Sequence, residues 1–235
     1  MLQSTDVRPE IEGHNVSLII DRYTSEGHLF RSDPLTYRLV HHIERYWHAA
    51  EVIDLHLGRA PVKVIDMGCG LGIGLEQLAA RSSLDLDMTG VEMDVEACNM
   101  AAASGTIRTF NCGIEEFDVV ERYDAVLCFE VVGFDTLSSD PNLLSLLRTC
   151  CSSDGLICVS APNYRGRKKK GYFERTYSLQ EFRTLLESSF PDSSDISIYG
   201  QLYPSNRKAM SDVGVQPVDD LSAEPDFCMG VVKFP

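Results

Sequence analysis

The sequence predicts an α/β fold: a doubly wound sheet of about seven strands whose last strand is antiparallel, with a helical cap at the N-terminus. An apolar strand pattern at residues 61–67 runs into a glycine-rich turn and then into a helical pattern at 73–83. Strand and helix patterns continue to alternate along the chain. An acid, Glu92, closes the second strand 20 residues after Gly72. Such alternation favours a parallel sheet with helices on both faces.

The later elements follow in order. We expect a strand at 87–94, a helix at 94–105, and strands at 107–112 and 123–132. Asp140 and Pro141 read as the cap and first residue of a helix over 140–155, which would also contain the vicinal Cys150–Cys151 pair, and a fifth strand follows at 155–163. Ser178 and Glu181 form a capping box ahead of a helix that reaches residue 190. An antiparallel pair at 196–201 and 227–234 would close the sheet, joined by a long connection at 202–225.

Upstream, residues 33–57 predict an amphipathic helix packed on the sheet, because apolar residues recur at 39, 43, 46, 47, 50 and 53. On this helix His41 and His48 share a face with Arg45, which we interpret as a solvated polar face, and His42 lies beside the apolar stripe. The polar, aromatic-dotted stretch at 21–33 suits a lid, on which Tyr23 and His28 are candidates to touch a substrate; an ordered leader strapped to the core would look the same.

Composition limits the function. A chain of 235 residues with 44% hydrophobic residues can bury one substantial core, so we expect one structural domain. No run of about 18 apolar residues could span a bilayer and no signal peptide opens the chain, which indicates a cytoplasmic protein. The eight cysteines form no C-x-x-C pair, and no histidine follows them at zinc-ligand spacing. We therefore expect reduced core thiols and no metal site.

Charge is distributed unevenly. The net charge of −14 would repel nucleic acid and anionic lipid, yet residues 165–175 hold six basic residues and one acid. This segment follows the fifth strand, at the sheet edge where open α/β folds bind ligands. Arg167 and Lys168 are candidates to attract an anionic small-molecule acceptor, while peripheral contact with an anionic membrane and a lysine-rich import signal are alternatives, as is plain solvated surface. Nucleic acid is an unlikely partner because the basic residues make one loop rather than a broad face.

The glycine turn, VIDMGCGLGIG at 64–74, separates two nucleotide cofactors. A dinucleotide site requires G-x-G-x-x-G, but here Gly68 and Gly70 are followed by Gly72, one residue early. The turn resembles motif I of the class I S-adenosylmethionine-dependent methyltransferases, which have a Rossmann-like fold. The segments YDAVLCFEVV and SSDGLICVSAPN resemble the small-molecule branch, and HHIERYWHAA resembles glycan and natural-product members. The resemblance covers roughly residues 60–235, the expected methyltransferase core, with residues 1–59 as lid and cap helix.

The resemblance implies S-adenosylmethionine as cofactor and S-adenosylhomocysteine as product. Asp66 with the backbone of the turn would hold the methionine end, Glu92 the ribose hydroxyls, and Met93 would lie against the adenine. The cofactor residues that it implies are Asp66, Gly68, Cys69, Gly70, Gly72, Glu92, Met93, Ile114, Glu115, Phe129 and Glu130. His42 joins Tyr23, His28, Arg167 and Lys168 as a substrate candidate.

Two departures from the family pattern bear on mechanism. Relatives often carry Gly-Asp before Ile-Glu-Glu, whereas this chain has Cys112–Gly113, which leaves the Ile114 backbone and the Glu115 side chain for the adenine amine. Relatives frequently carry Glu-His after the fourth strand, whereas Gly133–Phe134 stand here. Any general base must come from elsewhere, and the histidine-bearing N-terminal segment is the place to look. The expected reaction is O-methylation of a sugar or natural-product metabolite; a lipid or quinone-type acceptor and a non-catalytic cofactor-binding subunit are the alternatives.

Overall fold

A computed structural model describes residues 34–58, 60–134, 137–163, 175–203, 208 and 213–235. Its eight strands form one sheet in the order β3-β2-β1-β4-β5-β8-β6-β7. Strands β1 (Val62–Met67), β2 (Leu86–Val91), β3 (Ile107–Phe110), β4 (Tyr123–Cys128) and β5 (Cys151–Pro162) are parallel, whereas β8 (Phe227–Lys233) pairs antiparallel with both β5 and β6 (Asp195–Gln201). The predicted α/β fold with an antiparallel last strand is confirmed.

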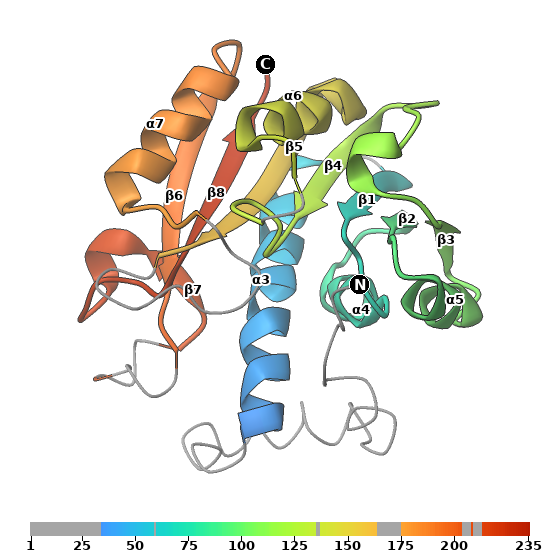
Figure 1. The fold of residues 1–235 in the computed structure, drawn as a ribbon, viewed down its shortest axis with the longest axis horizontal. Coiled ribbons are helices and arrows are strands. Elements are labelled where there is room, and N and C mark those ends of the chain that lie inside the picture. The colour runs from blue at the N-terminus through green and yellow to red at the C-terminus, as the bar shows by residue number, and fades with distance from the viewer. Residues whose placement is uncertain (1–33, 59, 135–136, 164–174, 204–207, 209–212) are drawn as a thin grey trace.

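Within the described residues, five helices lie on the two faces of the sheet (Figure 1). Helices α6 (Asp140–Cys150) and α7 (Leu179–Ser189) cover one face, and α3 (Pro34–His56), α4 (Ile73–Arg81) and α5 (Val95–Ala103) cover the other. Each face has its own apolar core: Leu144 and Phe182 belong to the first, and Tyr46, Ile53 and Leu75 to the second. Because α3 supplies residues to the same core as the strands, we infer that cap and sheet form one structural domain.

The structure has one strand more than the sequence predicted. Strand β7 (Val215–Pro217) pairs with β6 inside the long connection at 202–225, which also contains the short 3-10 helix Val218–Asp220. Three residues are too few to produce a period of alternating apolar residues, so no pattern marks this strand.

Two details of α6 correct the sequence reading. Its N-cap is Ser139, whose side chain accepts from the Asn142 amide, while Asp140 turns into the protein. The helix stops at Cys150 and β5 begins at Cys151, so the cysteine pair straddles the boundary and the helix over 140–155 was predicted too long. The strand begins with the polar residues 152–154, which are partly or fully exposed, so no apolar alternation marks the boundary.

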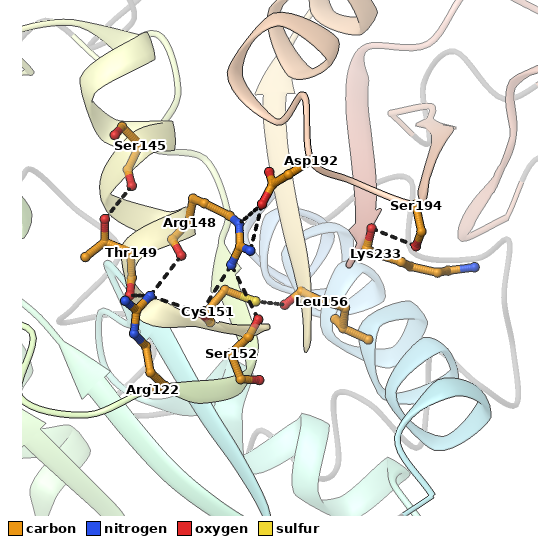
Figure 2. Close-up of polar contacts among 10 residues, drawn as sticks. All are labelled: Arg122, Ser145, Arg148, Thr149, Cys151, Ser152, Leu156, Asp192, Ser194 and Lys233. Carbon is orange, nitrogen blue, oxygen red and sulfur yellow. Dashed lines mark hydrogen bonds and ion pairs between the residues drawn. The ribbon is translucent and has the colours of Figure 1, made fainter. Parts of the chain in front are cut away.

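Arginines secure the end of α6 at the sheet edge where β5 starts (Figure 2). Arg122 donates from Nη1 to the Cys151 carbonyl at 3.2 Å and also to the carbonyls of Arg148 and Thr149. Arg148 donates to Asp192 after α7 at 2.8 Å. Its guanidinium also lies over the Phe234 ring, 3.9 Å from the ring centroid. These contacts satisfy carbonyls that a helix end leaves open, and they leave the opposite, carboxyl edge of the strands for the site.

Candidate active site

The glycine turn lies at the carboxyl end of β1, and all three of its predicted cofactor glycines have positive φ: 96° at Gly68, 54° at Gly70 and 79° at Gly72. They differ in what surrounds them. A Cβ on Gly70 would meet nothing within 4 Å, whereas one on Gly72 would come within 2.9 Å of Ala101 on α5. Gly70 therefore borders open space, and Gly72 allows α4 to begin close against α5.

The Cys69 side chain points away from this space. Its sulfur packs so closely on β2 that a Cβ on Gly90 would lie 2.5 Å from it, and burial raises the pKa of the thiol. Cys69 is thus an unreactive packing residue, and its backbone is fixed in the turn, because its amide donates to the Val91 carbonyl at 3.1 Å and its carbonyl accepts from the Gly72 amide at 3.0 Å.

Asp66, the last polar residue of β1, is fully buried. Its Oδ2 accepts a hydrogen bond of 2.8 Å from the Tyr46 hydroxyl on α3, while its Oδ1 has no hydrogen-bond partner among the described residues. Burial raises the pKa of Asp66 to about 7, and the Tyr46 hydrogen bond offsets part of that effect. A buried carboxylate oxygen without a partner costs free energy, so this atom is suited to accept from a ligand amine.

Tyr46 reaches Asp66 because α4 carries a glycine where the two helices cross. A Cβ on Gly74 would lie 2.2 Å from the Tyr46 ring. The ring also packs edge-on against Phe129, at 4.9 Å between centroids. The fourth glycine of the turn therefore serves the contact between α3 and α4, a role that spacing alone did not reveal.

Glu92 follows β2 and is held at both oxygens. It accepts from the Gly70 amide at 3.0 Å and from the Asp94 amide at 2.8 Å, which fixes the carboxylate beside the turn. Met93 is 70% exposed, and Asn111 donates to the backbone carbonyls of both Glu92 and Met93. A large apolar side chain this exposed beside an anchored carboxylate offers a surface for a flat ring.

The two candidates for the adenine end lie on a 3-10 helix, Ile114–Glu116. The Ile114 side chain packs toward the turn, since its Cδ1 would lie 3.7 Å from a Cβ on Gly68. The Glu115 carboxylate accepts from the backbone amide of Ser138 at 3.2 Å and also from its hydroxyl. Both candidates thus already accept hydrogen bonds, because the Ile114 carbonyl accepts from the Phe117 amide at 3.2 Å.

A buried polar network joins α3 to the ends of β4 and β6. The Arg45 side chain is 0% exposed; its Nη1 lies 2.6 Å from Glu130 Oε1, and its Nε donates to Gln201 at 2.9 Å. Its guanidinium also lies over the Phe227 ring, at 4.4 Å. His41 is buried as well and stacks on Tyr203. The prediction of a solvated face was wrong, because the ends of β6 and β8 cover it.

Glu130 is the only non-glycine residue with positive φ in the part of the chain that the structure describes, at 60°. Desolvation raises the pKa of its carboxyl, but the Arg45 guanidinium and the nearby His42 outweigh it and hold that pKa well below its usual range. His42 Nδ1 lies 3.8 Å from Glu130 Oε1, and about a third of each side chain is exposed. Strained backbone of this kind persists where surrounding contacts fix it, often at functional sites.

The comparison with known proteins decides the family. A family model described as a methyltransferase domain matches residues 35–199. The chain belongs to this methyltransferase family. Its sheet has the class I methyltransferase architecture, and three features fit S-adenosylmethionine as the cofactor: Asp66 Oδ1 without a partner among the described residues, the open side of Gly70, and the anchored Glu92.

The methyltransferase resembles several characterised proteins. It is 27% identical over 140 residues to a ubiquinone biosynthesis O-methyltransferase of Chromobacterium violaceum, covering 57% of this chain and 56% of that relative. A protein of the same name from Glaesserella parasuis is 28% identical over 124 residues, covering 47% of this chain and 48% of the relative. The matched region thus spans about half the length of these curated relatives.

Solved structures share the fold. The plantazolicin methyltransferase BpumL, in complex with a triazolic desmethylPZN analogue and S-adenosylhomocysteine, has a TM-score of 0.59 at 18% identity, covering 93% of this chain and 98% of its own. A possible histamine N-methyltransferase of Thermotoga maritima also has a TM-score of 0.59, at 15% identity, covering 94% of this chain and 100% of its own. At these identities the likeness is one of architecture.

On the far side of the β4 end, the methyltransferase has a clamp centred on Asp140. This carboxylate is 1% exposed and accepts from the Gly133 amide at 2.9 Å, from Arg175 Nε at 2.7 Å and from the Tyr177 hydroxyl. Desolvation raises the pKa of Asp140, yet the hydrogen bonds from Arg175 and Tyr177 leave it below its usual value. The clamp fixes the loop after β4 to the last residue of the basic segment, so Arg175 is held rather than free to meet a ligand.

Of the predicted substrate residues, His42 is placed at the site, beside Glu130. Tyr23, His28, Arg167 and Lys168 lie outside the described residues. Sequence reasoning missed Tyr46, Arg45 and Gln201, which hold Asp66 and Glu130, and it missed Asn163 at the end of β5. Asn163 Oδ1 is buried without a hydrogen-bond partner among the described residues. Among these residues no cluster of histidine, cysteine and acidic side chains could hold a metal ion, and no helix is long and apolar enough to cross a bilayer.

Proposed function

We propose that this methyltransferase transfers the methyl group of S-adenosylmethionine to an oxygen of a small hydroxylated acceptor. The observation that carries the proposal is the buried Asp66 Oδ1 without a partner, next to a glycine turn with open space at Gly70. When bound, the cofactor supplies a methyl group on a positively charged sulfur, which is already activated for displacement. The chain then has to orient both reactants in line and exclude water.

The residue roles in the cofactor site are part of this proposal. Asp66 Oδ1 accepts from the amino group of the methionine end. The backbone of Gly68, Cys69 and Gly70 lies along its tail as a shaped surface, since the amides of the first two donate to the Val91 carbonyl and that of Gly70 to Glu92. Glu92 takes the ribose hydroxyls, and Met93 and the Ile114 backbone take the adenine. Phe129 and Glu130 border the methionine end from the β4 side, since Phe129 packs on the same Tyr46 ring that binds Asp66.

The names of the curated relatives favour a quinone-type, phenolic acceptor, and a sugar or natural-product metabolite is the second candidate. Asn163 Oδ1 supports a hydroxyl-bearing acceptor, because it is a buried acceptor atom at the same sheet edge that an incoming O–H could satisfy. The eight cysteines are unpaired, which supports a reducing compartment and hence the cytoplasm as the place of reaction.

Methyl-labelled S-adenosylmethionine, incubated with the protein and separately with catechol, a free hexose and a quinone-containing lipid extract, tests the acceptor class. Label in catechol or in the organic phase is the result we expect, and label in the hexose alone would move the assignment to the sugar. Cofactor binding in calorimetry without transfer to any acceptor would favour the non-catalytic subunit.

An anionic acceptor has its own test, because it would be drawn to the positive charge of residues 165–175. The kcat/KM should then fall steeply with added salt, and replacing Lys168, Lys169 and Lys170 by glutamine should flatten that dependence. A kcat/KM that does not change with salt would remove the anionic acceptor from the proposal.

A further inference from the structure

We propose that His42 is the general base that removes the acceptor proton, and that Glu130 and Arg45 are the positioning residues that orient its ring. The inference rests on the proposed function and deepens it by naming the group that handles the proton. It is drawn from the placement of a helix residue against the end of a strand that follows it by more than 80 residues in sequence.

His42 lies close to Asp66, the residue proposed to hold the methionine end of the cofactor. His42 packs edge-on against Tyr46, at 5.2 Å between ring centroids, and the Tyr46 hydroxyl binds Asp66 at 2.8 Å. If Asp66 holds the methionine end of the cofactor, His42 lies one side chain away from that end, and the reactive sulfur belongs to that end. With about a third of its side chain exposed, His42 is reachable by an acceptor, whereas Arg45 beside it is fully buried.

Hydrogen bonds fix Arg45 and Glu130, the two residues that orient the His42 ring. Arg45 is immobilised by Gln201, which itself donates to the His41 carbonyl at 2.7 Å and to Glu44 at 2.6 Å. Arg45 in turn binds Glu130, and the Glu130 amide donates to Ser160 Oγ at 3.0 Å. This network holds Glu130 at its strained φ of 60°. With this backbone conformation, the Glu130 carboxylate points at Arg45 and at His42 Nδ1.

Two side chains here, His42 and Glu130, could in principle take the acceptor proton. Glu130 is a poor base because Arg45 at 2.6 Å stabilises its ionised form. Arg45 Nη1 also lies 3.5 Å from His42 Nδ1, but it already donates to Glu130 at the shorter distance. An Nδ1–H directed at Glu130 leaves the Nε2 lone pair for the acceptor. Among the residues that the structure describes, the groups that face His42 are Arg45 and Tyr46 on its own helix, Glu130 after β4, and Asp66 on β1 beneath Tyr46.

His42 Nε2 takes the proton of the acceptor O–H while the oxygen forms a bond to the methyl carbon and the carbon–sulfur bond breaks. The electron pair of that bond remains on sulfur, which becomes a neutral thioether. The imidazolium, stabilised by the Glu130 carboxylate, then releases its proton to solvent. No oxidant, reductant or metal takes part.

Comparing an acceptor that needs a base with one that does not gives the test. Catechol carries a protonated hydroxyl at neutral pH, whereas 4-nitrocatechol is already ionised. For His42→Ala we expect kcat with catechol to fall by about 100-fold or more, in line with general-base contributions, and kcat with 4-nitrocatechol to fall far less. A merely structural role would lower both equally, and that result would overturn the proposal.

Controls separate this inference from the cofactor assignment. His56→Gln, at the exposed end of the same helix, should leave kcat unchanged. Binding of S-adenosylhomocysteine to His42→Ala, measured by calorimetry, should stay within about threefold of the unchanged protein, because the loss is in proton transfer. Failure of the proposed function would instead appear as no binding to the unchanged protein. Glu130→Gln should lower kcat for catechol more than for 4-nitrocatechol, and equal loss would contradict the positioning role.

Discussion

At the scale of single residues, the site is organised around carboxylates that the fold treats differently. Asp66 is buried against one neutral hydroxyl and its pKa is raised to about 7, whereas Glu130 is paired with an arginine and its pKa is lowered. Asp66 is therefore near its titration point at physiological pH, while Glu130 stays charged. Ligand binding at Asp66 should depend on pH.

The first prediction concerns Asp66→Asn. Since the folded-state pKa is raised, the contribution of the neutral carboxyl to stability is complete below about pH 4 and is lost as pH rises through about 7. The free energy of unfolding of the variant should therefore rise with pH relative to that of the unchanged protein. Over this window the difference should change by at most about 4 kcal/mol, which corresponds to a pKa raised by about three units. Urea unfolding of both proteins at about pH 5 and about pH 8 measures it, and a difference that does not change with pH would contradict it.

A companion measurement follows the ligand. The affinity of the unchanged protein for S-adenosylhomocysteine should rise with pH up to about 8, because the ammonium group needs an ionised Asp66. For Asp66→Asn it should be at least about tenfold weaker and flat with pH.

The second prediction uses two glycines with the same backbone requirement. Gly70 and Gly105 both have positive φ, at 54° and 71°, and a Cβ on either would meet nothing within 4 Å. Alanine should cost about 1 kcal/mol of stability at each position. Only Gly70→Ala should weaken S-adenosylhomocysteine binding in calorimetry, since Gly105 lies beyond α5. Equal weakening by both variants would show that the effect is general strain.

At the scale of elements, the Asp140 clamp sets the loop after β4. The third prediction is that Arg175→Met lowers the free energy of unfolding by about 3 kcal/mol, because it removes the cation of a pair whose carboxylate is buried. Arg81→Met is the matched control: its partner Glu51 and Arg81 itself are each 56% exposed, so the cost should stay within about 0.5 kcal/mol. Similar losses for both would argue against the clamp.

The elements also show what a sequence can predict. Apolar periodicity located α3 and α7, and the Ser178–Glu181 capping box marks the start of α7 as predicted. The polar face of α3 was misread because its partners, Gln201 and Phe227, lie more than 150 residues away in sequence. A helical pattern shows which residues share a face, but it does not show whether another strand end covers that face. Tyr46 and Glu130 were brought to the site by the same long-range packing.

Site residues that lie close together in sequence could be predicted, whereas contacts between distant segments could not. The glycine turn and Glu92 lie within one βα unit and the strand that follows it, so spacing alone located them, and the Glu92–Gly70 hydrogen bond joins residues 22 apart. The absence of a histidine after Glu130 directed attention to the histidine-bearing N-terminal segment, and the structure places His42 of that segment beside Glu130. That His42, rather than its neighbour His41, faces Glu130 depends on how α3 is rotated against the sheet, which periodicity leaves open by one residue.

At the scale of the whole molecule, the proposed cofactor site spans the centre of the sheet, because its contacts reach from β1 and β2 to β4. The fourth prediction is that S-adenosylhomocysteine at about 100 times its Kd stabilises the fold by about 2.7 kcal/mol. For a chain of this size that corresponds to a rise in Tm of about 5–11 °C. Differential scanning fluorimetry measures it, with NADH as the control ligand. A comparable shift with NADH would contradict the cofactor assignment.

The strand order has a consequence for biosynthesis. Strand β8 is translated after β6, yet it lies between β5 and β6 and is hydrogen-bonded to both. The hairpin of β6 and β7 therefore lacks its native neighbour while residues 227–233 are still unmade, and the contacts of Gln201 and Phe227 with Arg45 cannot all form. A nascent chain elongating at about 5–20 residues per second would expose an unpaired β5 edge for that interval. The parallel part of the sheet is thus synthesised before the strand that completes it. A chaperone that binds exposed strand edges would bind this intermediate.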